Sequence, residues 1–455
     1  MRLAIVGGCV FDPASGWDGQ ERDIYLENGR VVDYLPAVDQ VINARGLAVT
    51  PAALEIRSPV AGFGQNFLRL WRGMPSPAEL GQAYALLGYT HVHEPYLTLQ
   101  TANYVHQELA ALPIVDTSAS LAINLRDVDL WLQDPQKLAE VGEAWAYLLE
   151  ATRALNLHVV EPFVRFRQEF YRFRTLTEAK VMDRLFALLD HRRLPLTLTA
   201  TPALLALDQP VPPDVHLSSL GAALTDDALL ERTLQRLAAG LSADMGLLPP
   251  APRPGLPSRP VQVDLGWFQP FDLLPEVDTR VAQRALRLAF LGKEFRLAFS
   301  VASLLPLPLS RFPQVFAWLG HADSRRRDWG HMQAEGTYSF SDWLRATRLL
   351  PAKYLGLTDR GHLRPGARGD VALYDLPAPD NWVESCQRCR LLCKAGELVV
   401  HNYEVVQPQV AKATHYRRTQ AVPNKLVAEI CQNRSLRPEN LQVHAQPHLH
   451  WRQVA

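Results

Sequence analysis

The sequence of 455 residues predicts an α/β protein, in which a (β/α)8 TIM-like barrel lies beside a small composite β-sandwich. Residues 1–47 alternate short strands with turns and leave no room for helices. From about residue 50, strand and helix patterns alternate roughly eight times, which is the number of units in a closed parallel barrel. After residue 350 short strands return, so the two ends of the chain are expected to share one β layer.

We therefore divide the chain into four parts. Residues 1–50 form the N-terminal part of the sandwich and 51–350 the barrel. Residues 351–405 form the C-terminal part of the sandwich, and 406–455 are a polar C-terminal tail without a regular pattern.

The N-terminal part contains four short apolar or alternating runs, which we predict to be strands. They cover 3–6, 23–26, 31–33 and 41–44. The sequence Glu-Asn-Gly-Arg at 27–30 is typical of a hairpin turn between the second and third of these strands.

The middle of the chain shows the alternating apolar runs and 3.6-residue periodicity of a barrel. Strands are expected at 54–56, 90–94, 114–116, 158–160, 196–199, 215–217, 261–264 and 296–300. Helices are expected at 79–87, 99–111, 135–155, 178–190, 226–241 and 277–291, with Gly88 as a helix stop and Thr225 as an N-cap.

After the barrel, Ser341 is expected to cap a helix that ends at Leu350. A turn rich in Gly and Pro then leads into a strand at 371–374, and further strands follow near Leu391 and Val399.

The charge balance excludes several classes of partner. Lys and Arg number 47, as do Asp and Glu, and the isoelectric point is about 7.2. A nucleic-acid or anionic-membrane partner would favour a basic surplus. No apolar run is long enough to cross a membrane, and the first apolar run ends in a turn cluster, so we expect a cytoplasmic protein.

Three of the five cysteines are close together as C-x-x-C-x-x-x-C, at Cys386, Cys389 and Cys393. A metal centre would need a fourth ligand and a surrounding loop. The flanking residues indicate two strands and a turn, so structural thiols are the favoured interpretation, and the odd number argues against a disulfide framework.

Several segments resemble one superfamily in their order and spacing. Residues 23–32 and 361–374 carry its general features. More particular are 88–94, 106–116, Asn124, 312–313 and 351–357. The chain resembles the amidohydrolase superfamily and, within it, the A subunit of formylmethanofuran dehydrogenase and its bacterial counterpart in the formyltransferase/hydrolase complex of methylotrophs.

This resemblance implies a binuclear zinc enzyme that cleaves the formamide C–N bond of formylmethanofuran to formate, or runs the reverse reaction. In the family, an H-x-H pair, a carboxylated lysine, further histidines and an aspartate hold the metals. By the resemblance, the H-x-H pair falls on Arg57 and Pro59, the lysine on His158 and the aspartate on Ala302. The metal site is therefore degenerate, and no zinc is expected.

The remaining family positions are also changed. The strand at 196–199 presents no histidine. After the next strand the ligand position falls on Ser218 or Ser219, with His216 as the other candidate.

Charged residues near these positions are expected to form pairs within the protein. An inward Arg57 would repel a dication and is expected to pair with Glu55, Glu94 or Glu161. Glu108 and Asp116 are expected to be capping or ion-pair residues.

Two functions follow from this pattern. The first is a catalytically silent protein that acts as a scaffold for the other subunits of such a complex and for a methanofuran-like ligand. The alternative is an active amidohydrolase with a rebuilt site that uses His91, His93, His158 and His216.

Overall fold

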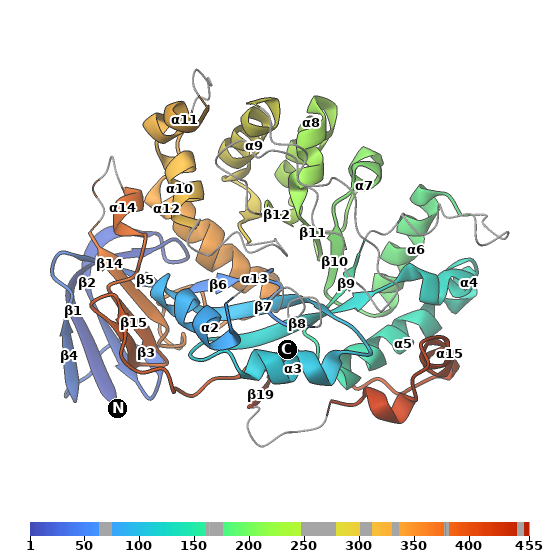
Figure 1. Cartoon of the computed structure of the whole chain (residues 1–455), viewed down its shortest axis with the longest axis horizontal. Coiled ribbons are helices and arrows are strands. Elements are labelled where there is room, and N and C mark those ends of the chain that lie inside the picture. The colour runs from blue at the N-terminus through green and yellow to red at the C-terminus, as the bar shows by residue number, and fades with distance from the viewer. Residues whose placement is uncertain are drawn as a thin grey trace.

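The computed structural model describes residues 1–62, 75–160, 163, 176–246, 279–300, 312–329, 336–376, 378, 382–443 and 450–454. Two sheets organise this part of the chain (Figure 1). No helix among these residues is long and apolar enough to cross a membrane.

The first sheet joins the two ends of the chain. Its order is β17-β16-β15-β14-β5-β1-β2-β3, and β4 also pairs with β1. The central pairing is antiparallel and runs from Val371 opposite Pro51 to Asp375 opposite Leu47. The strands are β1 Arg2–Asp12, β2 Trp17–Glu27, β3 Arg30–Val32, β4 Gln40–Asn43, β5 Leu47–Pro51, β14 Val371–Asp375, β15 Leu391–Lys394, β16 Glu397–His401 and β17 Glu404–Val405. The predicted sharing of a β layer is therefore confirmed, while the division into four domains stays a prediction.

The second sheet contains eight parallel strands that pair in chain order. They are β6 Ala53–Glu55, β7 Tyr89–Leu97, β8 Asp116–Ile123, β9 Asn156–Val159, β10 Leu196–Thr199, β11 Val215–Ser218, β12 Ser242–Asp244 and β13 Arg296–Ala298. Helices flank this curled sheet (Figure 1). The predicted TIM-like α/β fold is confirmed.

The helices that follow the strands are mostly those predicted. They are α2 Pro77–Leu86, α3 Ala102–Ala110, α4 Asp129–Leu132, α5 Leu138–Ala151, α6 Glu178–His191, α7 Pro202–Ala206, α8 Asp227–Ala238, α9 Thr279–Gly292, α10 Phe312–Gly320 and α11 Ala322–Trp329. Later helices are α12 Phe340–Leu344, a π-helical turn Arg345–Leu349, α13 Leu350–Leu355, α14 Trp382–Ser385 and α15 Lys425–Asn433.

The first and last barrel strands, β6 and β13, form no ladder in the described part of the chain. Helix α13 packs between them instead, and Leu350 and Leu355 share an apolar cluster with Leu54 of β6 and Ala298 of β13. The sheet is thus completed by helix packing rather than by a final strand pair.

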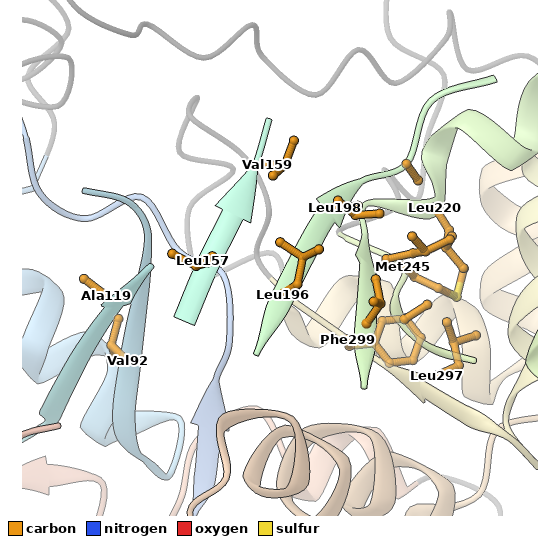
Figure 2. Close-up of a cluster of buried hydrophobic side chains, with 14 of the residues drawn as sticks. Val92, Ala119, Leu157, Val159, Leu196, Leu198, Leu220, Met245, Leu297 and Phe299 are labelled. Carbon is orange, nitrogen blue, oxygen red and sulfur yellow. The ribbon is translucent and has the colours of Figure 1, made fainter. Parts of the chain in front are cut away.

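Side chains on the barrel strands alternate between two environments. Leu157, Val159, Leu196 and Leu198 face the apolar layer beneath the helices (Figure 2). The intervening positions are polar and buried, as at His158. Since alternate residues on a strand point to opposite faces, the barrel interior is lined by polar groups.

Two predicted caps are wrong by one or two residues. Asp226, not Thr225, caps α8 by accepting from the backbone N–H groups of Ala228 and Leu229. Ser339, not Ser341, caps α12, because only Ser339 has an acidic residue three positions later to complete a capping box.

Two strand predictions also need correction. The third barrel strand begins at Asp116, where the predicted strand 114–116 ended, and its Thr and Ser residues are buried. Strand β12 Ser242–Asp244 was not predicted, and the strand predicted at 261–264 lies outside the described residues.

The expectation of an irregular C-terminal tail is wrong for the segments that the structure describes. Strand β18 Thr414–Arg417 pairs in parallel with β8 at Thr117 and Ser118, and β19 Trp451–Val454 pairs with β18. Strand β9 pairs with β8 only from Ser120 onward. The edge of β8 before Ser120 is therefore left for β18 to pair with.

Asp116 joins the two sheets and the C-terminal segment through one buried carboxylate. It forms ion pairs with Lys394 of β15 at 2.6 Å, with Arg360, and with Arg368 at 3.5 Å. It also accepts the backbone N–H of Ala413 at 2.8 Å. Burial alone would raise the pKa of Asp116, but the three cations outweigh it and hold the pKa well below its usual value. The predicted ion pairing of Asp116 is confirmed.

We expect Asp116→Asn to lower the free energy of unfolding by about 3–5 kcal/mol, because it leaves Lys394 and Arg360 buried without their counter-charge. Urea unfolding at pH 7 measures this. Asp208→Asn, which removes an exposed partner of Arg232, is the control and should cost at most about 1 kcal/mol. Equal losses in the two variants would contradict the role given to Asp116.

Candidate functional site

Arg57 lies just after β6 at the C-terminal end of the barrel, with only 3% of its surface exposed. Its guanidinium donates to the Tyr96 hydroxyl at 2.8 Å, and its backbone N–H donates to Glu55 at 2.8 Å. Arg57 therefore points inward, as its predicted pairing requires. The ion pair with Glu55, Glu94 or Glu161 stays a prediction, and Glu161 lies outside the described residues.

Glu94 of β7 fixes the loop that contains Pro59, which is buried. Its carboxyl accepts the backbone N–H groups of Val60, Ala61 and Tyr96 at 2.8, 2.9 and 3.1 Å. Burial raises the pKa of Glu94 to about 8, although these N–H groups oppose the shift. The conformation of the loop thus depends on the Glu94 carboxyl group. From the sequence, Glu94 was expected only as a possible ion-pair partner of Arg57.

His91 and His93 of β7 bind serine hydroxyls inside the barrel. The two rings lie 2.9 and 2.7 Å from the Ser118 hydroxyl, and His93 also lies 2.7 Å from that of Ser120. Burial lowers the pKa of His93 to about 3, helped by the neighbouring His158 and His216. These two histidines are neutral and belong to a hydrogen-bond network on β7 and β8.

His158 of β9 has both ring nitrogens in contact with protein groups. Its Nδ1 lies 3.1 Å from the Pro95 carbonyl and its Nε2 lies 3.0 Å from the Thr199 hydroxyl. A carbonyl only accepts, so Nδ1 carries the proton and Nε2 accepts from Thr199. Burial, and then the charge of Arg57, lower the pKa of His158 to about 3. Its ring stacks on that of Tyr96 at 5.3 Å between centroids.

Asp244, at the end of β12, is the acidic residue that the sequence reasoning missed. Its carboxylate lies 3.1 Å from His216 Nε2 and accepts from Ser300 at 2.5 Å and from the backbone N–H of Gly246 at 3.2 Å. Burial would raise the pKa of Asp244, but the His216 hydrogen bond and the charge of Arg57 bring it below its usual value. Asp244 thus provides a negative charge that Arg57 stabilises.

His216 connects Asp244 to the opposite end of the barrel. With Nε2 donating to Asp244, its Nδ1 accepts from the Ser242 hydroxyl at 2.9 Å. Burial lowers the pKa of His216 despite the Asp244 carboxylate, so the ring is neutral and the pair carries one negative charge.

The interior residues do not fit a zinc centre. Within the described ranges, no three His, Cys, Asp or Glu residues converge in a way that could hold a metal ion. The nitrogens of His158 face a carbonyl and a hydroxyl, and the Arg57 guanidinium, whose charge reaches His158, His216 and Asp244, would repel a dication. The structure therefore does not gather His91, His93, His158 and His216 into one ligand set, and Ala302 lies outside the described residues.

The three neighbouring cysteines are buried thiols. Cys389 donates to the Ala85 carbonyl at 3.1 Å. Burial raises the pKa of Cys386, and raises those of Cys389 and Cys393 to about 12. All three are therefore protonated at neutral pH, as the structural interpretation predicts, whereas metal ligation needs thiolates.

Comparison with known proteins agrees with this architecture. Residues 308–400 match the Amidohydrolase family. The chain is 26% identical, over 89% of its length and 89% of the relative's, to the A subunit of the formyltransferase/hydrolase complex Fhc of Methylorubrum extorquens. The protein FwdA of Methanocaldococcus jannaschii is 27% identical over 36% of this chain and 32% of its own.

Solved structures give the same fold. A chain of the formyltransferase/hydrolase complex FhcABCD from Methylorubrum extorquens, crystallised with methylofuran, superposes with a TM-score of 0.79 at 22% identity and full coverage of both chains. Molinate hydrolase superposes with a TM-score of 0.55 at 15% identity, over 88% of this chain and 94% of its own.

The chain thus contains an amidohydrolase domain in an amidohydrolase fold. Among proteins of this fold, it is a homologue of the A subunit of the formyltransferase/hydrolase complex.

The buried neutral histidines make stability depend on pH. In the unfolded chain a histidine titrates near pH 6.5, whereas His93 and His158 bind a proton in the folded state only near pH 3. Between these values the unfolded state binds more protons. Their contribution to stability is complete above about pH 6.5 and is lost as the pH falls toward 3, by about 1.4 kcal/mol per pH unit for each residue.

We expect His158→Gln to make the unfolding free energy depend less steeply on pH between about pH 6 and 4. The slope should fall by about 1.4 kcal/mol per pH unit, which corresponds to one proton fewer bound on unfolding. Urea unfolding at several pH values measures it. His401→Gln is the control, because His401 is exposed in the folded chain as well, and its slope should match that of the unaltered chain. An unchanged slope in His158→Gln would mean that this ring is not held neutral.

Proposed function

We propose that this chain is a component, of the A-subunit type, of a formyltransferase/hydrolase-type complex in one-carbon metabolism linked to methanofuran and tetrahydromethanopterin. It acts in the cytoplasm as a catalytically silent scaffold. The observation that carries the second part of this proposal is the inward Arg57 at the end of β6, with its charge balanced by Asp244.

The repulsion between Arg57 and a zinc ion, compared with the binding free energy of a zinc site, supports the proposal that the metal is lost. A zinc ion about 4 Å from a guanidinium would be destabilised by roughly 8 kcal/mol at an effective dielectric constant of about 20. A complete structural zinc site is worth about 10–16 kcal/mol. With arginine and proline in place of the H-x-H pair, the ligands left could not offset that repulsion.

The fold can persist without the metal. The apolar residues of the strands, such as Leu157, Leu196 and Leu217, pack under the helices and not in the barrel interior. A barrel stabilised by this layer can lose its ligands and keep its outer surface. A scaffold role needs only that surface.

The partners follow from the relative's assembly. The complex FhcABCD from Methylorubrum extorquens was crystallised with methylofuran. We propose that the other subunits of such a complex bind this chain, and that a methanofuran-like molecule is the ligand of the assembly.

Metal analysis tests the silent site. We expect the chain purified from its native host to contain well under one zinc per chain, and chelation to leave its melting temperature unchanged. An amidohydrolase with an intact metal site, purified in parallel, is the control for metal loss during handling. Close to two zinc ions per chain would overturn the proposal.

Co-purification tests the scaffold. We expect a tagged chain, isolated from its native host at physiological salt, to bring with it proteins homologous to the other subunits of the complex, in fixed ratio by mass spectrometry. An untagged strain serves as the control. Isolation of the chain by itself, in a form stable as a monomer, would contradict the assembly role.

The alternative function predicts a different result. An amidohydrolase with a rebuilt site would release formate from a formylated amine, and His158→Ala would abolish that release. Formate production by the isolated chain with this sensitivity would replace the scaffold proposal.

A further inference from the structure

A cavity of about 550 Å³ lies at the end of the barrel opposite Arg57 and Glu94. Its walls come from the N-terminal ends of strands β9 to β13, from loops before them, and from residues of α6, α13 and β18. In barrels of this kind, activity is found at the other end, and this face normally only stabilises the fold. A cavity of ligand-binding size is therefore unexpected here.

The inner end of the cavity is polar. His216, Ser242 and Tyr354 line it. The Tyr354 hydroxyl bonds to Asn156 at 2.9 Å and to Thr197 at 2.8 Å, and its ring packs against His216 with centroids 4.0 Å apart. Burial raises the pKa of Tyr354 to about 12, so the hydroxyl stays protonated. Tyr354 thus separates the cavity from the histidines deeper in the barrel.

The outer part of the cavity carries excess positive charge. Four cationic side chains line it, against two carboxylates at Asp190 and Asp214. The cations are Arg193, Arg296, Lys353 and Arg417. Arg296 donates to the backbone carbonyls of Pro213 and Gly240, both at 3.3 Å, and these neutral acceptors leave its charge in place.

The cavity also has an apolar wall, which could contact the uncharged part of a ligand. Phe186, Leu189 and Leu194 line it between the cations and the polar end. An apolar wall with a few convergent polar groups is the usual composition of a small-molecule pocket. The surplus of cations over carboxylates at its entrance favours an anionic group, which guanidinium and ammonium groups bind through charge-assisted hydrogen bonds.

We propose that this cavity binds a small organic anion, a carboxylate or phosphate ester. Its charged group lies between Arg296 and Lys353, and its body extends along the apolar wall toward Ser242 and His216. The site is separate from the barrel mouth and does not depend on the scaffold function.

Calorimetric titration of the full chain with glycerol 3-phosphate, inorganic phosphate and acetate, at low ionic strength, tests the proposal. We expect saturable binding of at least one of these probes at one site per chain. Lys353→Glu should weaken it by about tenfold or more, because the reversed charge repels the anion, and Lys353→Met by a smaller factor.

Lys180→Glu is the matched control. Lys180 is an exposed lysine on α6 outside the cavity, so its reversal changes the net charge equally and should leave the affinity unchanged. Binding of none of the probes would overturn the proposal. So would equal weakening by Lys180→Glu and Lys353→Glu, because that would show a general charge effect.

Discussion

The interior of this barrel depends on one electrostatic constraint, which is the compensation of the buried Arg57 charge. Arg57 occupies the end of the first barrel strand, and Asp244 at the end of the seventh supplies a carboxylate whose pKa the arginine lowers. His93, His158 and His216 are neutral because burial favours the uncharged ring, at His216 even against the Asp244 carboxylate. Among the described residues, the site is a network of hydroxyls, imidazoles and buried charged groups that include Arg57 and Asp244.

The apolar core of this fold does not depend on the side chains in the barrel interior. The apolar layer lies outside the strands, under the helices, and many polar groups inside are hydrogen-bonded, as His93 is with Ser118 and Ser120. A buried polar network of this kind stabilises only when its members are paired.

A second buried charge cluster joins the two sheets and the C-terminal segment. Asp116 holds Lys394 from the sandwich sheet, Arg360 and Arg368 from the segment before β14, and the backbone before β18. The relative positions of sandwich, barrel and C-terminal strands depend on it. At the other end of the barrel, a cavity of about 550 Å³ lies against Tyr354.

The sequence by itself determined the fold class and most of the alternation of strands and helices, because alternation and helical periodicity are local properties. Only the tertiary structure decided the partners of the buried polar and charged residues. Asp244 meets His216 across 28 positions and Asp116 meets Lys394 across 278, and such contacts depend on strand register and on folding of the whole chain. For the same reason the polar strand β8 was predicted too early, at 114–116, and the C-terminal strand β18 was not predicted. Their Ser, Thr and His residues look solvent-exposed in the sequence, and they are buried only because neighbouring strands satisfy their hydrogen bonds.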